Sequence, residues 1–339
     1  MGLFHNGFVG IDLGTANTIV AVKGKGIIIR EPSVVAVNME TKQIFAVGNE
    51  AKEMIGRTPA NITAIRPLKD GVIADFKSTQ SMLKYFIGKA MKITGVKKPW
   101  VLVGVPSDIS QVEKKAVVQA AEMAGAGKVG IIEEALAAAI GADLPVDEPT
   151  GSMVIDIGGG TTDVAVISLG GLVISATRRL GGDDIDSSIM QYIRNNFNLA
   201  VGERTSENIK MNLACALEDY EYSEMTFKGR DLISGLPKQV TITTKDIYAA
   251  IEEPIFTLMD TVKNVLERTP PELSSDIMNR GIALTGGGAL LRGLDKLIYQ
   301  ETGIECKIAE DPLDCVAHGT EKILDKGFNE IIFFNSKND

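Results

Sequence analysis

The chain has 339 residues, of which 45% are hydrophobic and 23% are charged, and its formal net charge is −9. The length allows two or more domains with a large core. The acidic balance argues against general nucleic-acid binding, because neutralising phosphates requires a basic face. Three cysteines without CxxC spacing and two histidines argue against a zinc site or a histidine-activated nucleophile.

The N-terminus and the hydropathy pattern predict a cytoplasmic protein. The first residues, MGLFHNGF, lack the cationic start and the longer apolar run of a signal peptide. No apolar run is long enough for a transmembrane helix. The scattered cysteines agree with a reducing compartment.

The first predicted element is a hairpin, GIDLGTANTIVAV, over residues 10–22. Its first strand contains Asp12, although strands disfavour Asp and a buried charge costs several kcal/mol without a partner. The same order recurs in VIDIGGGTTDVAVIS, over residues 154–168, where Asp156 takes the equivalent place. The chain is therefore predicted to contain one hairpin twice.

Between the hairpins, the pattern predicts a βαβ-type half that ends near Pro145–Pro149. A capping box of Ser110 and Glu113 begins one helix, and Gly125 ends it. The predicted elements are strands in 26–37 and 42–51, a helix over 78–94, a strand over 99–108, a helix over 111–127, and a strand with an Ala-rich helix over 128–142.

The second half repeats this plan, so two similar α/β lobes are expected to face each other across a cleft. We expect a bend near Pro254 in its long helix. The predicted elements after the second hairpin are helices near Asp184–Phe197 and Glu203–Leu217, a β segment over 236–245, the helix over 246–268, and a strand that runs through glycines into a helix over 280–298.

The glycines of each hairpin let backbone N–H groups point at one spot, which is typical of an anion site. One such hairpin alone is more often a plain β-turn, but two matching ones favour a shared site. Two carboxylates beside a phosphate repel it unless a divalent cation lies between them, and Mg²⁺ uses one or two carboxylates and keeps its waters. Asp12 and Asp156 are therefore predicted to hold Mg²⁺ against a polyphosphate.

A third glycine run, LTGGGALLRG over Leu284–Gly293, joins a strand to a helix. Its bare backbone allows a ring or a ribose to approach closely. The spacing does not fit the Rossmann fingerprint GxGxxG, and GAGKVG over Gly125–Gly130 lacks the Ser or Thr that follows the lysine of a P-loop.

These three motifs resemble the phosphate 1, phosphate 2 and adenosine motifs of the actin and DnaK-type ATPase superfamily. Further stretches, REPSVVAV, AIRPLKDGVIADF, GERTSENIK, GRDLISGLPK and LERTPPELSSDI, resemble the MreB family of bacterial actins, including Mbl and MreBH. The resemblance covers residues 8–325 and implies an α/β, actin-like fold of the duplicated ribonuclease H type, with ATP and Mg²⁺ between two lobes.

The resemblance also implies four subdomains and a set of nucleotide-binding residues. The subdomains are IA (residues 1–31, 75–144 and 320–339), IB (32–74), IIA (145–180 and 250–319) and IIB (181–249). The phosphate-binding residues would be Gly14, Thr15, Ala16, Asn17, Gly158, Gly159, Gly160, Thr161 and Thr162; the nucleoside-binding residues would be Glu203, Ser206, Glu207, Asn208, Lys210, Gly286, Gly287, Gly288 and Ala289. For the helix that carries Glu203 to Lys210, a solvated charged face is the alternative.

The stretch IIEEALAAAIG resembles the family pattern IEEPxAAAIG, with Ala135 in place of the proline. It implies that Glu134 positions the water that attacks ATP, with Thr161 and Asp163 near the γ-phosphate. Glu133, beside it, is expected to be structural.

The resemblance implies that the protein would be a filament-forming ATPase that organises cell shape at the inner face of the cell membrane. Its partners would be its own copies in paired antiparallel protofilaments, the lipid surface and membrane-protein adaptors. A small-molecule kinase of the same superfamily is the alternative, but no substrate-base or sugar motif is found. A chaperone ATPase would need a further substrate-binding domain.

Membrane contact is expected from apolar residues near basic ones. The N-terminus offers Leu3, Phe4 and Phe8, and the segment MKITGVKKPW offers Ile93, Val96 and Trp100 among lysines. The tail after Gly327, FNEIIFFNSKND, either docks onto the protein's own core, contacts the membrane or is disordered.

Overall fold

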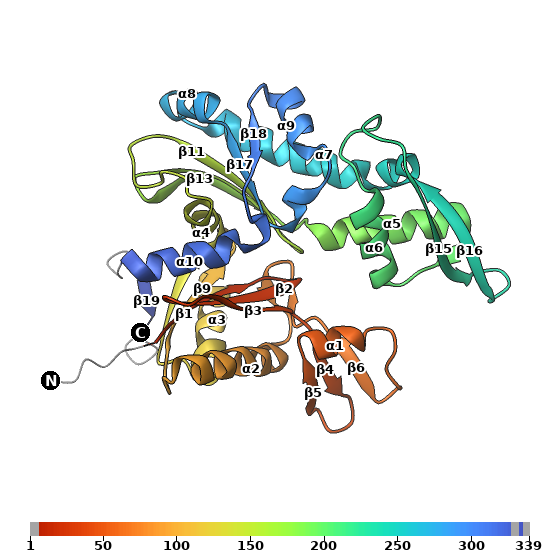
Figure 1. The fold of residues 1–339 in the computed structure, drawn as a ribbon, viewed down its shortest axis with the longest axis horizontal. Coiled ribbons are helices and arrows are strands. Elements are labelled where there is room, and N and C mark those ends of the chain that lie inside the picture. The colour runs from red at the N-terminus through yellow and green to blue at the C-terminus, as the bar shows by residue number, and fades with distance from the viewer. Residues whose placement is uncertain (1–6, 327–331, 335–339) are drawn as a thin grey trace.

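The computed structural model describes residues 7–326 and 332–334, which form two lobes, each built on a mixed β-sheet (Figure 1). The first sheet has the strand order β19-β10-β9-β1-β2-β3 and the second has β13-β12-β11-β17-β18. The first contains β1 (Phe8–Leu13), β2 (Asn17–Val22), β3 (Gly26–Pro32), β9 (Trp100–Val105), β10 (Lys128–Glu133) and β19 (Ile332–Phe334). The second contains β11 (Ser152–Ile157), β12 (Thr162–Ser168), β13 (Gly171–Arg178), β17 (Ile282–Thr285) and β18 (Cys306–Ile308).

Both predicted hairpins are present, and they begin the two sheets in the same way. β1 pairs antiparallel with β2 and parallel with β9, as β11 pairs antiparallel with β12 and parallel with β17. This shared pairing confirms that the chain contains one architectural unit twice.

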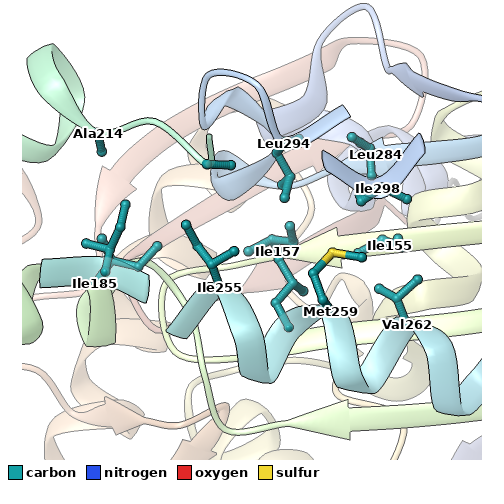
Figure 2. Packing of buried hydrophobic residues seen from close by; sticks show 14 of the residues in the cluster. Ile155, Ile157, Ile185, Ala214, Ile255, Met259, Val262, Leu284, Leu294 and Ile298 are labelled. Atoms are coloured by element: carbon teal, nitrogen blue, oxygen red, sulfur yellow. The ribbon is translucent and has the colours of Figure 1, made fainter. Parts of the chain in front are cut away.

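Helices cover both faces of the sheets. α4 and α10 lie between the two sheets, α2 and α3 cover the outer face of the first, and α7 covers the outer face of the second (Figures 1 and 2). Their bounds are α2 (Phe76–Thr94), α3 (Gln111–Met123), α4 (Glu134–Gly141), α7 (Thr244–Arg268), α8 (Pro271–Arg280), α9 (Leu294–Thr302) and α10 (Cys315–Lys326), with short 3₁₀ turns at Gly287–Leu290 and Pro312–Asp314.

Strand alternation explains where the two aspartates point. In β11, Ile155 and Ile157 pack into the core shared with α7 and α9, which Figure 2 shows from close by. Successive side chains of a strand point to opposite faces, so Asp156 lies on the face turned toward α4 and α10. In β1, Ile11 and Leu13 pack with the outer helices, and Asp12 faces inward by the same rule.

Each lobe carries a smaller subdomain with a three-stranded sheet. In the first lobe it contains β4 (Val35–Asn38), β5 (Ile44–Val47), α1 (Asn49–Glu53) and β6 (Ile62–Ile65), followed by the ribbon β7 (Leu68–Lys69) and β8 (Val72–Ile73). In the second lobe it contains α5 (Gly182–Phe197), β14 (Leu199–Ala200), α6 (Glu203–Leu213), β15 (Glu224–Asp231) and β16 (Pro237–Thr243).

Several local predictions are confirmed and one is wrong. Ser110 and Glu113 form the expected capping box of α3, and Gly125 follows its end at a φ of 113°. The helix expected over Glu203–Leu217 ends at Leu213, because Cys215 forms a β-bridge with Arg292. α7 continues through Pro254, and the bend there stays a prediction. Among the described residues, no helix is long and apolar enough to cross a bilayer.

Candidate functional site

A cavity of about 460 Å³ lies between the two lobes. Both hairpins and the third glycine run contribute to its wall, as the sequence predicts. The predicted site residues that line it are Asp12, Gly14, Thr15, Ala16, Asn17, Glu134, Asp156, Gly158, Gly159, Thr161, Glu207, Lys210, Gly286, Gly287 and Gly288.

The glycines of the two predicted phosphate turns, residues 14–17 and 158–162, are required by close packing. A β-carbon on Gly159 would lie 2.6 Å from Ala16 Cβ, and one on Gly160 would lie 2.8 Å from Thr15 Oγ1. The turns of the two lobes therefore touch each other at the base of the cavity. A side chain at either position would force them apart and change the place where backbone N–H groups meet.

The two strand aspartates have strongly perturbed proton affinities. Burial, with repulsion from Asp156 and Asp314, raises the pKa of Asp12 to about 8. Burial also raises the pKa of Asp156 to about 7, against a hydrogen bond from Thr285 that lowers it. Two acids that face one cavity, Asp156 buried and Asp12 half-buried, favour a bound cation, because a cation offsets both the desolvation cost and the repulsion.

The donor set fits Mg²⁺ and does not fit a metal held by protein alone. Within the described part of the chain, no group of three or more His, Cys, Asp or Glu side chains is placed to hold a metal ion. Mg²⁺ characteristically uses one or two carboxylates together with phosphate oxygens and water. Asp12 and Asp156, on opposite lobes at the wall of one cavity, have this character.

Glu134 is the first residue of α4 and is only 8% exposed. Burial raises its pKa well above the usual range, and the charges of Asp163, Asp12 and Asp156 raise it further. A buried carboxylate with raised proton affinity at the cavity wall is suited to accept a proton from a water molecule or to orient that water.

Asp163 lies behind the cavity wall instead of on it. One of its oxygens accepts hydrogen bonds from the backbone N–H of Ser107 and from the hydroxyl of Thr177, at 3.0 and 2.6 Å. Its other oxygen is buried and has no hydrogen-bond partner among the described residues. Asp163 acts on the site through its charge. After burial, this charge is the largest cause of the raised pKa of Glu134.

The nucleoside side of the predicted site is only partly assembled around the cavity. Glu207 and Lys210 line it, and Lys210 is held by Asp186 and by the backbone oxygen of Gly182, both at 2.8 Å. The other predicted residues lie away from the wall: Gly160, Thr162, Ser206 and Ala289 pack behind it, and Glu203 and Asn208 face solvent.

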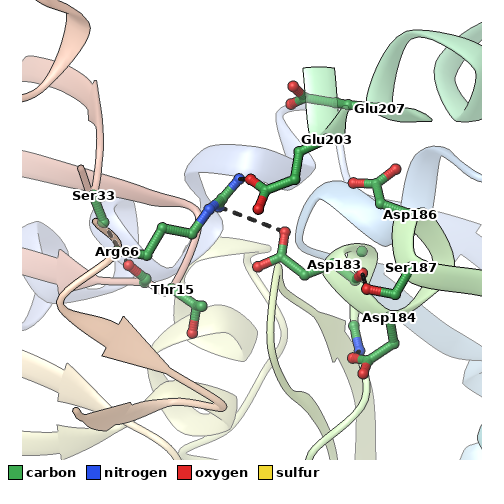
Figure 3. Close-up of polar contacts among 12 residues, drawn as sticks. Thr15, Ser33, Arg66, Asp183, Asp184, Asp186, Ser187, Glu203 and Glu207 are labelled. Atoms are coloured by element: carbon green, nitrogen blue, oxygen red, sulfur yellow. Dashed lines mark hydrogen bonds and ion pairs between the residues drawn. The ribbon is translucent and has the colours of Figure 1, made fainter. Parts of the chain in front are cut away.

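Sequence reasoning missed several lining residues, among them Lys52, Arg66, Asp183, Asp186 and Arg292. Arg66 and Asp183 approach each other from opposite sides of the cavity (Figure 3). Arg66 lies in AIRPLKDG, one of the stretches that carry the family resemblance, but a single arginine beside a proline has no spacing that indicates a role.

Known proteins with similar sequences support a specific family. A sequence model of the family described as MreB/Mbl protein matches residues 6–331. The cell shape-determining protein Mbl of Bacillus subtilis is 50% identical over 318 residues, covering 94% of this chain and 95% of that protein. The cell shape-determining protein MreB of Escherichia coli is 51% identical over 329 residues, covering 96% and 94%.

Solved structures give the same result for the fold. MreB5 of Spiroplasma citri bound to ADP matches with a TM-score of 0.90 and 40% identity, over 95% of this chain and 97% of that one. The same protein bound to AMPPNP matches equally well, at a TM-score of 0.90 and 39% identity, over 96% of this chain and 98% of that one. The actin-like fold expected from the sequence is therefore confirmed.

Proposed function

The chain belongs to the MreB/Mbl protein family, and from this we propose that it is an ATP-hydrolysing actin homologue that assembles into filaments and organises cell shape. One observation carries the proposal. Two Asp-Gly hairpins, one from each lobe, line the same cavity, and a buried glutamate, Glu134, lies at its wall. Relatives that share about half of its residues are named as cell shape-determining proteins.

The two hairpins would hold the phosphates of ATP through backbone N–H groups. Asp12 and Asp156 would hold Mg²⁺, which supplies positive charge to the phosphate oxygens. The structures of Spiroplasma citri MreB5 with ADP and AMPPNP support a nucleotide in the equivalent place. Because the turns belong to different lobes, a nucleotide held by both fixes the angle between the lobes.

Glu134 would orient the attacking water and accept its proton. It begins α4 directly after β10, so the carboxylate is fixed by a strand and a helix together. Asp163 would act through Glu134, because it does not line the cavity and one of its oxygens accepts hydrogen bonds from both Ser107 and Thr177. General-base catalysis of this kind contributes about 10²–10⁴-fold to a rate.

Assembly and hydrolysis are tested together by sedimentation and phosphate release. The full chain is incubated with ATP and Mg²⁺, with ATP and EDTA, and with ADP and Mg²⁺. We expect pelleted polymer and released phosphate in the first condition only. Equal pelleting in all three conditions, or no phosphate release with Mg²⁺, contradicts the proposal.

We also propose that the chain contacts the inner face of the membrane near the N-terminal ends of β1 and β9, in the middle of the first sheet. The backbone N–H of Trp100 donates to Gly7 O at 2.9 Å, so Gly7 lies beside the end of the 91–100 segment. Ile93 is 44% exposed, and Lys92, Lys97 and Lys98 are exposed near it. An apolar side chain among lysines fits an anionic lipid surface.

For the C-terminal tail, the sequence left three alternatives open: docking onto the protein, membrane contact or disorder. The backbone of Ile332–Phe334 pairs antiparallel with β10 at the edge of the first sheet. This pairing supports the alternative in which the tail docks onto the protein. Leu3, Phe4 and Ile331 lie outside the described residues. Membrane-protein adaptors remain expected partners.

A further inference from the structure

A short segment crosses both phosphate turns. Residues 66–71, which we call the strap, follow β6, contain β7 and end at the turn before β8. The backbone N–H of Gly71 donates to Thr15 Oγ1 at 3.1 Å, on the turn of the first lobe. A β-carbon on Gly71 would lie 2.8 Å from Thr161 Cγ2, on the turn of the second lobe. The strap therefore contacts the phosphate turns of both lobes at its Gly71 end.

The other end of the strap is tied to the opposite lobe by ion pairs. Arg66 Nη1 lies 3.5 Å from Asp183 Oδ1, and Arg66 Nη2 lies 3.7 Å from Glu203 Oε2 (Figure 3). Asp183 belongs to the first turn of α5 and Glu203 begins α6, so one guanidinium joins two helices of the facing subdomain. A planar guanidinium suits this task because its N–H groups fan out toward two carboxylates.

The ion pair between Arg66 and Asp183 lies at the cavity wall. Arg66 and Asp183 both line the cavity, and the Arg66 side chain is only 27% exposed. A second ion pair, between Lys52 and Glu207 at 3.2 Å, crosses the same gap between the subdomains. Widening the cavity by separating the small subdomains would break these contacts.

We propose that Arg66 is a positioning residue: its ion pairs with Asp183 and Glu203 hold the strap against both phosphate turns and slow the release of bound nucleotide. The inference rests on the proposed nucleotide binding in the cavity. Arg66 acts through the strap and through closure of the subdomains, without contact to the nucleotide. Nucleotide is therefore released faster when either Arg66 or its two acidic partners are neutralised.

The experiment measures the rate at which a fluorescent ATP analogue, bound with Mg²⁺ to the full chain, is displaced by excess ATP. The variants are Arg66→Gln, the double variant Asp183→Asn with Glu203→Gln, and all three changes together. Arg57→Gln is the matched control, because Arg57 is an exposed arginine of the same subdomain. Partly exposed ion pairs are weak individually, so we expect release to be about three- to tenfold faster in the first two variants.

The combined effect of the changes on the release rate tests whether Arg66, Asp183 and Glu203 act through the same contacts. The triple variant should release nucleotide no faster than the faster of the other two, since all three changes break one set of contacts. The conservative Arg66→Lys variant should fall between the unaltered chain and Arg66→Gln, and salt near 1 M should reduce the differences.

Three results overturn the inference. Release as slow as that of Arg57→Gln in all variants means that the ion pairs do not hold the nucleotide. Fast release from Arg66→Gln together with unchanged release from the acidic double variant means that Arg66 contacts the phosphates directly. If the unaltered chain binds no nucleotide at all, the proposed function is wrong, and the inference falls with it.

Discussion

Thr285 donates a hydrogen bond of 2.7 Å to Asp156, its direct partner in the parallel pairing of β11 with β17. The equivalent partner of Asp12, in the parallel pairing of β1 with β9, is Gly104, which has no side chain to donate. Asp156 thus accepts a side-chain hydrogen bond from the neighbouring parallel strand, whereas Asp12 has no side-chain donor at the equivalent position. This difference agrees with the higher pKa of Asp12, about 8 against about 7 for Asp156.

Replacing Thr285 by valine keeps the shape of the side chain and removes the hydroxyl. We expect the pKa of Asp156 to rise and the Mg²⁺ requirement of ATP hydrolysis to shift to about tenfold higher concentration, as is usual for partners of metal ligands. Titration of phosphate release with Mg²⁺ measures the midpoint. Thr257→Val, on the outer helix α7, is the control. An identical midpoint in Thr285→Val would show that the hydroxyl is structural.

Asp12→Asn and Asp156→Asn test the two carboxylates themselves. Each change keeps the size of the side chain and removes its charge, so Mg²⁺-dependent hydrolysis should fall strongly. Nucleotide binding in EDTA should persist, because the glycine N–H groups of the turns remain. Titration of phosphate release with Mg²⁺ measures the first effect, and equilibrium binding of ADP in EDTA measures the second. If the Mg²⁺ midpoint of hydrolysis is unchanged in both variants, the aspartates are not metal ligands.

Glu134→Gln is expected to bind ATP normally and to hydrolyse it about 10²–10⁴-fold more slowly, because the amide cannot accept a proton. Single-turnover phosphate release at equal ATP occupancy measures the effect. Glu133→Gln is the control, since Glu133 forms an ion pair with Lys114 at 3.5 Å and does not line the cavity. Equal rates for the two variants would remove Glu134 from the chemistry.

The sequence predicted the parts of this site that repeat. Asp12 and Asp156 stand out because a strand with an internal carboxylate before a glycine turn occurs twice, and Glu134 was found through family resemblance. Arg66 was missed because its partners, Asp183 and Glu203, are more than a hundred residues away and come together only across the cleft. The end of α6 was predicted too late in the sequence because Cys215 forms a β-bridge with Arg292, a residue distant in the chain.

The contribution of Asp12 and Asp156 to the stability of the nucleotide-free protein should fall as pH rises from about 4 and be lost above about 8. Asp12 and Asp156 bind protons more tightly in the folded protein than in the unfolded chain, where their pKa is near 3.8. The folded state therefore holds more protons, and its advantage is lost as the pH passes through about 7 and about 8.

Thermal unfolding in EDTA at pH 6, 7.5 and 9 measures this loss. The unfolding temperature of the double variant Asp12→Asn with Asp156→Asn should decline less with pH. Adding Mg²⁺ with ADP should raise the unfolding temperature of the unaltered chain most at pH 9. A decline equal in the double variant and the unaltered chain would assign it to other groups.

Binding to anionic vesicles should depend on the 91–100 segment more than on the C-terminal tail. The net charge of −9 opposes an anionic surface, so attraction has to be local. Lys92, Lys97 and Lys98 contribute about 1 kcal/mol each near such a surface. Insertion of Ile93 adds up to roughly 1.5–3 kcal/mol, so Ile93→Asp should weaken co-sedimentation of the monomer about tenfold or more.

A chain that ends at Gly327 separates the segment from the tail. Because the backbone of Ile332–Phe334 pairs with β10, we expect this shorter chain to sediment with vesicles nearly as well as the full chain. Filaments multiply weak contacts by avidity, so the comparison is made in EDTA, where assembly should be absent. If the truncation abolishes sedimentation of a folded chain and Ile93→Asp does not, the tail makes the contact. The pairing with β10 must then open at the membrane.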